Sequence, residues 1–164
     1  MKYVLIGKIV NTHGLKGEVR ILSDFKYKEK AFIPNMKIYI GKNKQEEKII
    51  TYRHHKIFEM ITMEGYNDID EVLKYKGEYV FVNKEDIKLN KNEYLDEDII
   101  GLNAIVNDKV LGRVQKIENH NGNYILLVKN DNKTYLIPYN FDIILNINLE
   151  TKEINIKNIP GLFD

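Results

Sequence analysis

The residues best placed to do chemistry lie in a short polar loop near the N-terminus. His13 stands beside Gly14, Lys16 stands beside Gly17, and Arg20 follows closely. Glycines at this spacing permit positive φ angles and a close approach of the backbone to a partner. Imidazole, ammonium and guanidinium groups on such a loop could contact the phosphates or base edges of a nucleic acid. The pattern indicates a binding loop and not a P-loop, because no Gly-Lys-Ser/Thr element opens a helix.

Each of these side chains also has a plain structural interpretation. His13 could do no more than cap the turn. Arg20 would share a strand face with Glu18, so these two side chains could form an internal ion pair. Lys16 at the tip of the loop has no such neighbour. The spacing therefore favours Lys16 as a phosphate ligand and leaves both interpretations open for His13 and Arg20.

No pattern in the chain predicts a catalytic centre or a metal site. The sequence has no cysteine, and the neighbours His54 and His55 would point to opposite faces of a strand. Carboxylates are scattered through turns, and no nucleophile has an evident activating base. The residues by themselves therefore indicate no acid/base pair, no activated nucleophile and no metal site.

The basic residues are concentrated in the same part of the chain as the loop. Residues 1–60 contain 13 Lys/Arg and 6 Asp/Glu, a net charge of +7, whereas residues 61–93 and 94–164 each carry −3. A polyanion would be attracted to the N-terminal region. A solvated lysine-rich face would give the same counts, so charge alone does not distinguish such a face from a surface that binds a polyanion.

Runs of β-branched and aromatic residues on both sides of the loop predict a small β-barrel that positions it. In this region Asp68 and Glu71 have the spacing of a capping box, which predicts one short helix over residues 67–77. The predicted strands are residues 3–10, 18–22, 37–40, 48–52, 57–63 and 79–82.

Hydrophobicity falls and charge dominates over residues 83–98, as in a linker between two cores. Beyond this segment, strand signals separated by polar turns predict a second small barrel. Its predicted strands are residues 102–106, 110–117, 124–128, 133–137, 142–146 and 153–156. We therefore expect a mainly β chain with an N-terminal domain at residues 1–85, a linker at 86–97 and a C-terminal domain at 98–164.

Three residues outside the loop could contact a partner. Tyr94, in the linker, suits either a partner surface or the groove between the two domains. Arg113, in a predicted strand, could face a partner protein or solvent. Tyr139 follows Pro138 in a rigid turn and could belong to the core or to a binding platform.

Seven sequence segments occur in a characteristic order along nearly the whole chain. The first is GKIVNTHGLKGEVRILSDF at residues 7–25. It is followed by RHHK at 53–56, DEVL at 70–73, DIIG at 98–101, LGRV at 111–114, LIPY at 136–139 and PGLF at 160–163. This ordered set resembles the bacterial ribosome maturation factor RimM family, whose N-terminal signature is a G-K-[IV]-[VT]-x-x-[HF]-G-[LI]-[KR]-G-E-[VL] run.

The resemblance implies an N-terminal six-stranded barrel of the translation-factor type and a C-terminal PRC barrel. It implies a cytoplasmic ribosome assembly factor that works by binding, with no enzymatic activity, no metal and no cofactor. We expect this factor to be monomeric and free of membranes. Such a factor binds the immature small ribosomal subunit, through the rRNA of its head and small-subunit protein nineteen, and assists late maturation and rRNA processing. The residues implied in RNA or ribosome binding are His13, Gly14, Lys16, Gly17 and Arg20, and those implied in partner-protein or interdomain contact are Tyr94, Arg113 and Tyr139.

The chain departs from the family pattern in two places. The family commonly has paired tyrosines before its Asp-Leu-Ile-Gly element, whereas this chain has Tyr94-Leu95. This chain therefore has only one of the two tyrosine rings that are common in the family. The C-terminal turn, usually close to Gly-Ala-x-Asp, here reads Asn121-Gly122-Asn123-Tyr124 and lacks the acidic side chain.

An alternative function from another class is a flavin- or nucleotide-binding β-barrel enzyme. Small barrels related to the predicted first domain also occur in flavin-binding reductases. A flavin enzyme would carry a bound chromophore, so the visible absorbance of the purified protein separates the two hypotheses.

Overall fold

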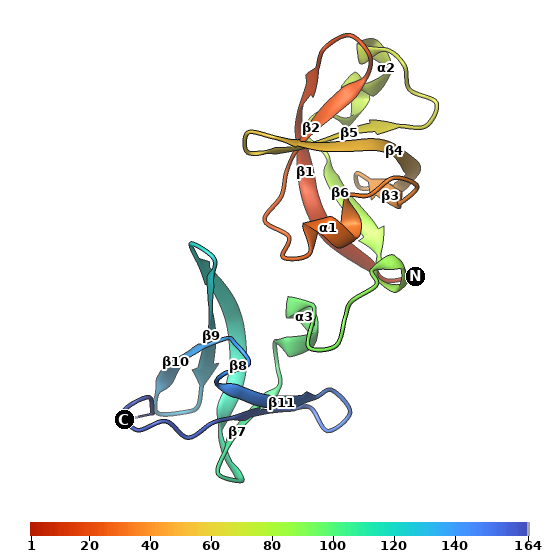
Figure 1. Ribbon diagram of the computed structural model, residues 1–164. Helices are drawn as coiled ribbons and strands as arrows, with labels where there is room; N and C mark the ends of the chain where they lie inside the picture. The colour runs from red at the N-terminus through yellow and green to blue at the C-terminus, as the bar shows by residue number, and fades with distance from the viewer. Residues whose placement is uncertain (164) are drawn as a thin grey trace. The chain divides into compact units, whose positions relative to one another are not determined.

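The computed structural model describes residues 1–163, and the chain divides into two compact units, Met1–Asn90 and Lys91–Asp164 (Figure 1). Twelve strands and a few short helical segments make up the described part of both units. The mainly β fold class predicted from the sequence is confirmed. No helix among the described residues is long and apolar enough to cross a lipid bilayer.

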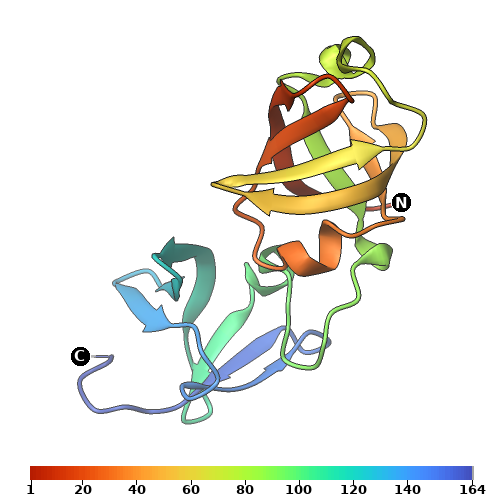
Figure 2. The same ribbon diagram turned by 45° about the horizontal axis from the view of Figure 1, so that its top comes forward.

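The first unit is a closed six-stranded barrel with the strand order β1-β2-β5-β4-β3-β6. Its strands are β1 (Tyr3–His13), β2 (Glu18–Leu22), β3 (Lys37–Ile40), β4 (Gln45–His55), β5 (Phe58–Met63) and β6 (Tyr79–Asn83). Figure 2 shows β4 and β5 side by side across one face of the barrel, in agreement with their antiparallel pairing. Closure means that every strand of this sheet has two neighbours, so no edge is left unpaired.

Strand β1 is long enough to pair with β6 in its first half and with β2 in its second half. The register shifts between Leu5 and Gly7 and again between Ile9 and Asn11. Such bulges bend a strand and increase its twist, which a small closed barrel requires. The interior is filled by side chains that alternate along the strands, among them the fully buried Ile9, Val19 and Ile61.

Short helical segments lie at the two ends of the first barrel (Figures 1 and 2). Helix α1 (Lys28–Ala31) is a single turn that the sequence patterns did not predict, because one turn is too short to show a helical period. Helix α2 (Ile69–Val72) continues into the 3-10 turn η1 (Leu73–Tyr75), within the range predicted to be helical.

The start of α2 is capped in the way that its sequence predicts. The Asp68 side chain accepts a hydrogen bond from the backbone N–H of Asp70 at 2.8 Å. The Glu71 carboxylate accepts one from the N–H of Asn67 at 3.2 Å, one residue earlier than the capping-box pattern requires. These bonds fix the segment against which the polar loop between β1 and β2 rests.

The second unit is a six-stranded sheet with the order β10-β9-β8-β7-β12-β11, in which β7 and β12 are parallel. Its strands are β7 (Asn103–Val106), β8 (Lys109–His120), β9 (Asn123–Lys129), β10 (Thr134–Pro138), β11 (Ile144–Asn148) and β12 (Glu153–Ile156). Leu126, Val128, Ile137 and Ile154 are fully buried in its core. The segment predicted to be a linker contains helical turns at its ends, η2 (Lys84–Asp86) and α3 (Asp96–Ile99).

A close approach between β8 and β9 explains why a glycine occupies position 112 in β8. A Cβ atom on Gly112 would lie 2.7 Å from the carbonyl oxygen of Lys129 and 3.1 Å from a methyl group of Val128. We predict that Gly112→Ala lowers the free energy of unfolding of the second unit by about 1–3 kcal/mol, because backbone must move to relieve the clash.

Amide hydrogen exchange would report this loss of stability. Exchange in β8 and β9 should be faster in Gly112→Ala than in the parent, whereas exchange in the first barrel should be unchanged. Val110→Ala, at an exposed position of the same strand, is the matched control and should change stability by less than about 0.5 kcal/mol. Unchanged protection of β8 and β9 in Gly112→Ala would contradict the prediction.

Candidate nucleic-acid interface

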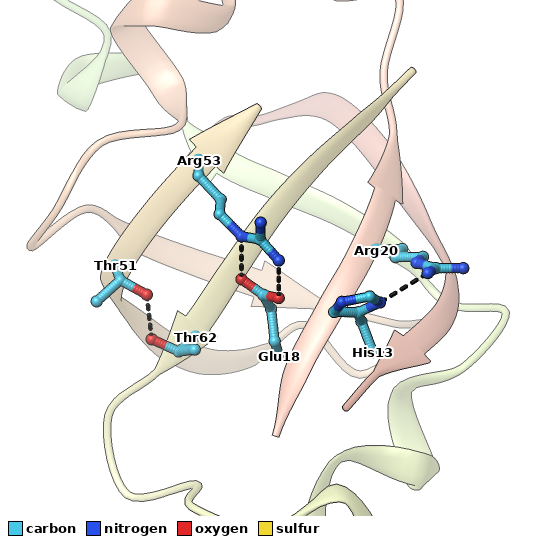
Figure 3. A network of polar contacts seen from close by, with 6 residues as sticks. All are labelled: His13, Glu18, Arg20, Thr51, Arg53 and Thr62. Atoms are coloured by element: carbon cyan, nitrogen blue, oxygen red, sulfur yellow. Dashed lines mark hydrogen bonds and ion pairs between the residues drawn. The ribbon is translucent and has the colours of Figure 1, made fainter. Parts of the chain in front are cut away.

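The outer surface of β1, β2, β5 and β4 carries a cluster of cationic and imidazole side chains (Figure 3). On β2, Val19 and Ile21 point into the barrel, so Glu18 and Arg20 alternate with them and point outward. We call this surface the basic face, which consists of His13, Glu18, Arg20, Arg53, His55 and Phe58.

Arg20 is held by its neighbours on β1 and β5. Its Nη2 atom donates a hydrogen bond to Nδ1 of His13 at 2.6 Å, and its guanidinium carbon lies 5.3 Å from the centre of the Phe58 ring. An arginine side chain has only donors, so Nδ1 of His13 must be the acceptor and carry no proton. Both contacts fix the direction of the guanidinium without cancelling its charge.

Glu18 pairs with Arg53, so the ion pair between Glu18 and Arg20, which the sequence left open as an alternative, does not form. Nε of Arg53 lies 2.9 Å from one Glu18 oxygen, and its Nη2 atom lies 2.8 Å from the other. This two-point hydrogen bond from Arg53 holds the pKa of the Glu18 carboxyl below its usual value. The sequence could not show it, because β2 and β4 meet only across β5 in the closed barrel.

His55 lies close to His13, with ring centres 6.2 Å apart. Partial desolvation and the positive charge of Arg53, followed by Lys56 and other neighbours, lower the pKa of the His55 imidazole. The lowered pKa favours the uncharged form of His55 at neutral pH, which can donate a hydrogen bond or stack. The basic face therefore combines guanidinium charge that is independent of pH with the pH-dependent charge of His55.

One atom of the basic face lacks any partner. Nε of Arg20 is the single buried side-chain nitrogen or oxygen without a hydrogen bond among residues 1–163. Leaving such a donor unpaired costs about 1–3 kcal/mol. The rest of the guanidinium belongs to a residue of intermediate exposure and has no carboxylate partner among residues 1–163, so its charge remains available to an anion.

The polar loop between β1 and β2 is fastened to the start of α2. Gly17 has a φ angle of +87° and is buried, and a Cβ atom there would lie 3.3 Å from the backbone N and O of Asp68. The carbonyl oxygen of Leu15 accepts a hydrogen bond from the N–H of Ile69 at 3.0 Å. Leu15, whose side chain is 80% exposed, and Lys16 therefore stand in solvent on a rigid support beyond Gly14.

The remaining predicted residues lie in the second unit. Arg113 is exposed on β8, opposite Asn103 and Lys129. Tyr94 is half-buried, packs against the core of this unit, and borders a hollow lined by residues 146–150. Tyr139 is only 7% exposed and lies in that core, with its backbone N–H bonded to the carbonyl oxygen of Tyr124 at 2.8 Å.

Sequence reasoning missed Arg53 and Phe58 and assigned no binding role to His55. The neighbour of His55, His54, instead contacts Glu59, a carboxylate that is only 1% exposed, at 2.9 Å. Glu59 also accepts a hydrogen bond from the Tyr52 hydroxyl at 2.6 Å, and burial and this bond raise the pKa of Tyr52 to about 12. No group of three or more potential metal ligands occurs among residues 1–163.

Comparison with known proteins agrees with this architecture over almost the full length of the chain. The family model of the RimM N-terminal domain matches residues 4–87, and that of the RimM PRC barrel domain matches residues 96–162. A ribosome maturation factor RimM of Staphylococcus haemolyticus is 40% identical, over 98% of this chain and 99% of the relative. One of Bacillus mycoides is 36% identical, over 98% of both chains.

A solved structure of a Pseudomonas aeruginosa protein titled as a 16S ribosomal RNA processing protein RimM is 22% identical. It covers 96% of this chain and 98% of its own, with a TM-score of 0.48, too low to add to the argument. The two family models and the relatives that align over nearly the whole chain are sufficient to assign the family. The chain belongs to the RimM family of ribosome maturation factors.

Proposed function

We propose that this protein binds the immature small ribosomal subunit and assists its late maturation and 16S rRNA processing. Its relatives are named as ribosome maturation factors. In this proposal the first barrel contacts the rRNA of the subunit head, and the second unit engages small-subunit protein nineteen. The protein acts in the cytoplasm as a monomer and by binding, without catalysis.

The observation that carries the RNA-binding part is the unequal pairing of charges on the basic face. Arg53 has a carboxylate partner in Glu18, whereas Arg20 is bonded to a neutral imidazole and a ring. Lys16 extends from the adjoining loop, so positive charge exceeds negative charge at this surface. Guanidinium groups fixed in direction bind phosphate oxygens with two hydrogen bonds, which suits an RNA backbone.

Binding alone is sufficient for an assembly role. A protein that binds one conformation of an RNA more tightly than another shifts the RNA population toward it by its difference in affinity. The rigid loop and the fixed Arg20 reduce the entropy that is lost when the complex forms. We therefore assign the loop residues His13, Gly14, Lys16 and Gly17, together with Arg20, to the RNA contact.

For the second unit, we propose that Arg113 and Tyr94 contact the ribosomal protein. Arg113 is exposed on its strand, and Tyr94 leaves part of its ring at the surface beside a hollow. Arginine and tyrosine are common anchors of protein interfaces. Tyr139 lies in the core of the same unit, so we assign it an indirect role in this contact.

Charge reversal on the loop and on β2 tests the proposed RNA contact. Lys16→Glu combined with Arg20→Glu should weaken binding to immature small subunits at least about tenfold and reduce its salt dependence, because two phosphate contacts are lost. Filter binding across a salt series measures both quantities. Lys37→Glu combined with Lys76→Glu, at exposed positions of the same unit, makes the same change of net charge and should bind nearly as the parent does.

Circular dichroism melting must show that the Lys16/Arg20 variant remains folded. If a folded Lys16/Arg20 variant binds with the affinity of the parent, the loop and Arg20 do not belong to the interface. Equal losses in both charge-reversal variants would show that only the net charge of the protein matters.

The pKa of His55 leads to a prediction about the pH dependence of RNA binding. The His55 imidazole should titrate with a midpoint below its ordinary value of 6.5, and Arg53→Gln should raise that midpoint, because the strongest neighbouring positive charge is removed. NMR observation of the His55 ring protons gives the midpoint. RNA phosphates favour the protonated ring, so affinity should increase as the pH falls through this midpoint, and His55→Gln should remove that part of the increase. A His55 midpoint at or above 6.5 in the free protein would contradict the assignment.

A further inference from the structure

A second surface of the first barrel exposes aromatic rings. It lies on β1 and β6, where Leu5 pairs with Phe81 and Lys8 pairs with Tyr79 across the two strands. The alternate residues of these strands, such as Val80 and Val82, are buried inside the barrel. We call this surface the aromatic strip, which consists of Tyr3, Leu5, Tyr79 and Phe81 with the lysines Lys8 and Lys44.

The side chains of the strip are open to solvent. Tyr79 and Leu5 are each 50% exposed, and Tyr3 is 38% exposed. The ring centres of Tyr3 and Phe81 are 6.4 Å apart, and Tyr79 follows two residues from Phe81 on the same side of β6. The three rings therefore form a row along the outer surface of two neighbouring strands.

Lysine ammonium groups lie over these rings. Nζ of Lys44 is 4.2 Å from the centre of Phe81 and 5.6 Å from that of Tyr3. Nζ of Lys8 is 5.4 Å from the centre of Tyr79. A cation at an exposed ring gains only about 0.5–1 kcal/mol, so a flat ligand can displace it at little cost.

We propose that the aromatic strip binds an unpaired segment of RNA by stacking its bases on Tyr79 and Phe81. Each displaced ammonium group is then within reach of the phosphates that flank the stacked base. Rings and lysines in alternation match the alternating bases and phosphates of a single strand. A duplex does not fit, because its bases are already stacked on one another.

Exposure indicates which end of the strip is more open to a ligand. Tyr79 is 50% exposed, whereas Tyr3 is 38% exposed and its ring packs against that of the buried Tyr39, with ring centres 5.2 Å apart. The RNA contact is therefore centred on Tyr79 and Lys8.

This inference uses none of the residues of the basic face. The two surfaces can be tested separately, because a phosphate contact depends on the backbone of the ligand whereas stacking depends on its bases. Failure of the strip would leave the proposed role of the basic face in place, and the reverse is also true.

The experiment compares a short fluorescent oligoadenylate with an abasic oligonucleotide of the same length, each titrated with the full chain and followed by fluorescence anisotropy. The parent should bind the oligoadenylate more tightly than the abasic strand. Tyr79→Leu should weaken oligoadenylate binding about fivefold to a hundredfold, the range for one stacked base, and leave abasic binding unchanged. Tyr79→Phe keeps the aromatic face and should bind as the parent does.

A matched lysine pair tests the phosphate part of the inference. Lys133 lies 5.0 Å from the ring centre of Tyr135 in the second unit, much as Lys8 lies over Tyr79. Lys8→Gln should weaken binding of both oligonucleotides, and Lys133→Gln should weaken neither. Equal affinity of the parent for the two oligonucleotides, or unchanged oligoadenylate binding in a folded Tyr79→Leu variant, would overturn the inference.

Discussion

The two-point bond between Arg53 and Glu18 determines how the rest of the basic face is arranged. It brings together a carboxylate from β2 and a guanidinium from β4, with β5 between the two strands. Because both oxygens of Glu18 are engaged by Arg53, Arg20 turns to His13 and Phe58 and keeps its full charge. A partly exposed ion pair stabilises a fold only slightly. Its main effect here is to decide which of the two arginines remains available to a polyanion.

Closure of the barrel makes this arrangement possible. The bulges of β1 allow one strand to complete the sheet on both sides, and the buried Gly17 brings the following loop against the start of α2. A larger residue at Gly17 would have to adopt a left-handed conformation against backbone atoms. Lys16 and Leu15 are consequently presented by a segment whose conformation is fixed before any partner arrives, which favours a specific interaction over a flexible one.

The sequence was sufficient to predict the strands, the capped turn at Asp68 and the glycine loop. Each of these depends on residues that are close together in the chain. The sequence failed for Glu18, whose partner is distant in sequence and is set by the order of strands in a closed barrel. His55 was left without a function for the same reason, since its position beside His13 depends on the twist of the sheet. The aromatic strip could not be predicted either, because the alternation of side chains along a strand does not show which aromatic residues of β1 and β6 face solvent.

Strand β1 takes part in both surfaces, with His13 at one end of it and Tyr3 and Lys8 nearer the other. Phosphate contacts weaken steeply as salt increases, whereas stacking on an aromatic ring depends on salt far less. A barrel that used the two kinds of contact would combine rapid, charge-steered encounter with a slower check on whether the bases of the RNA are unpaired. Stacking, and not the phosphate contacts, would then report whether the bases are unpaired, because only unpaired bases expose their faces to a ring.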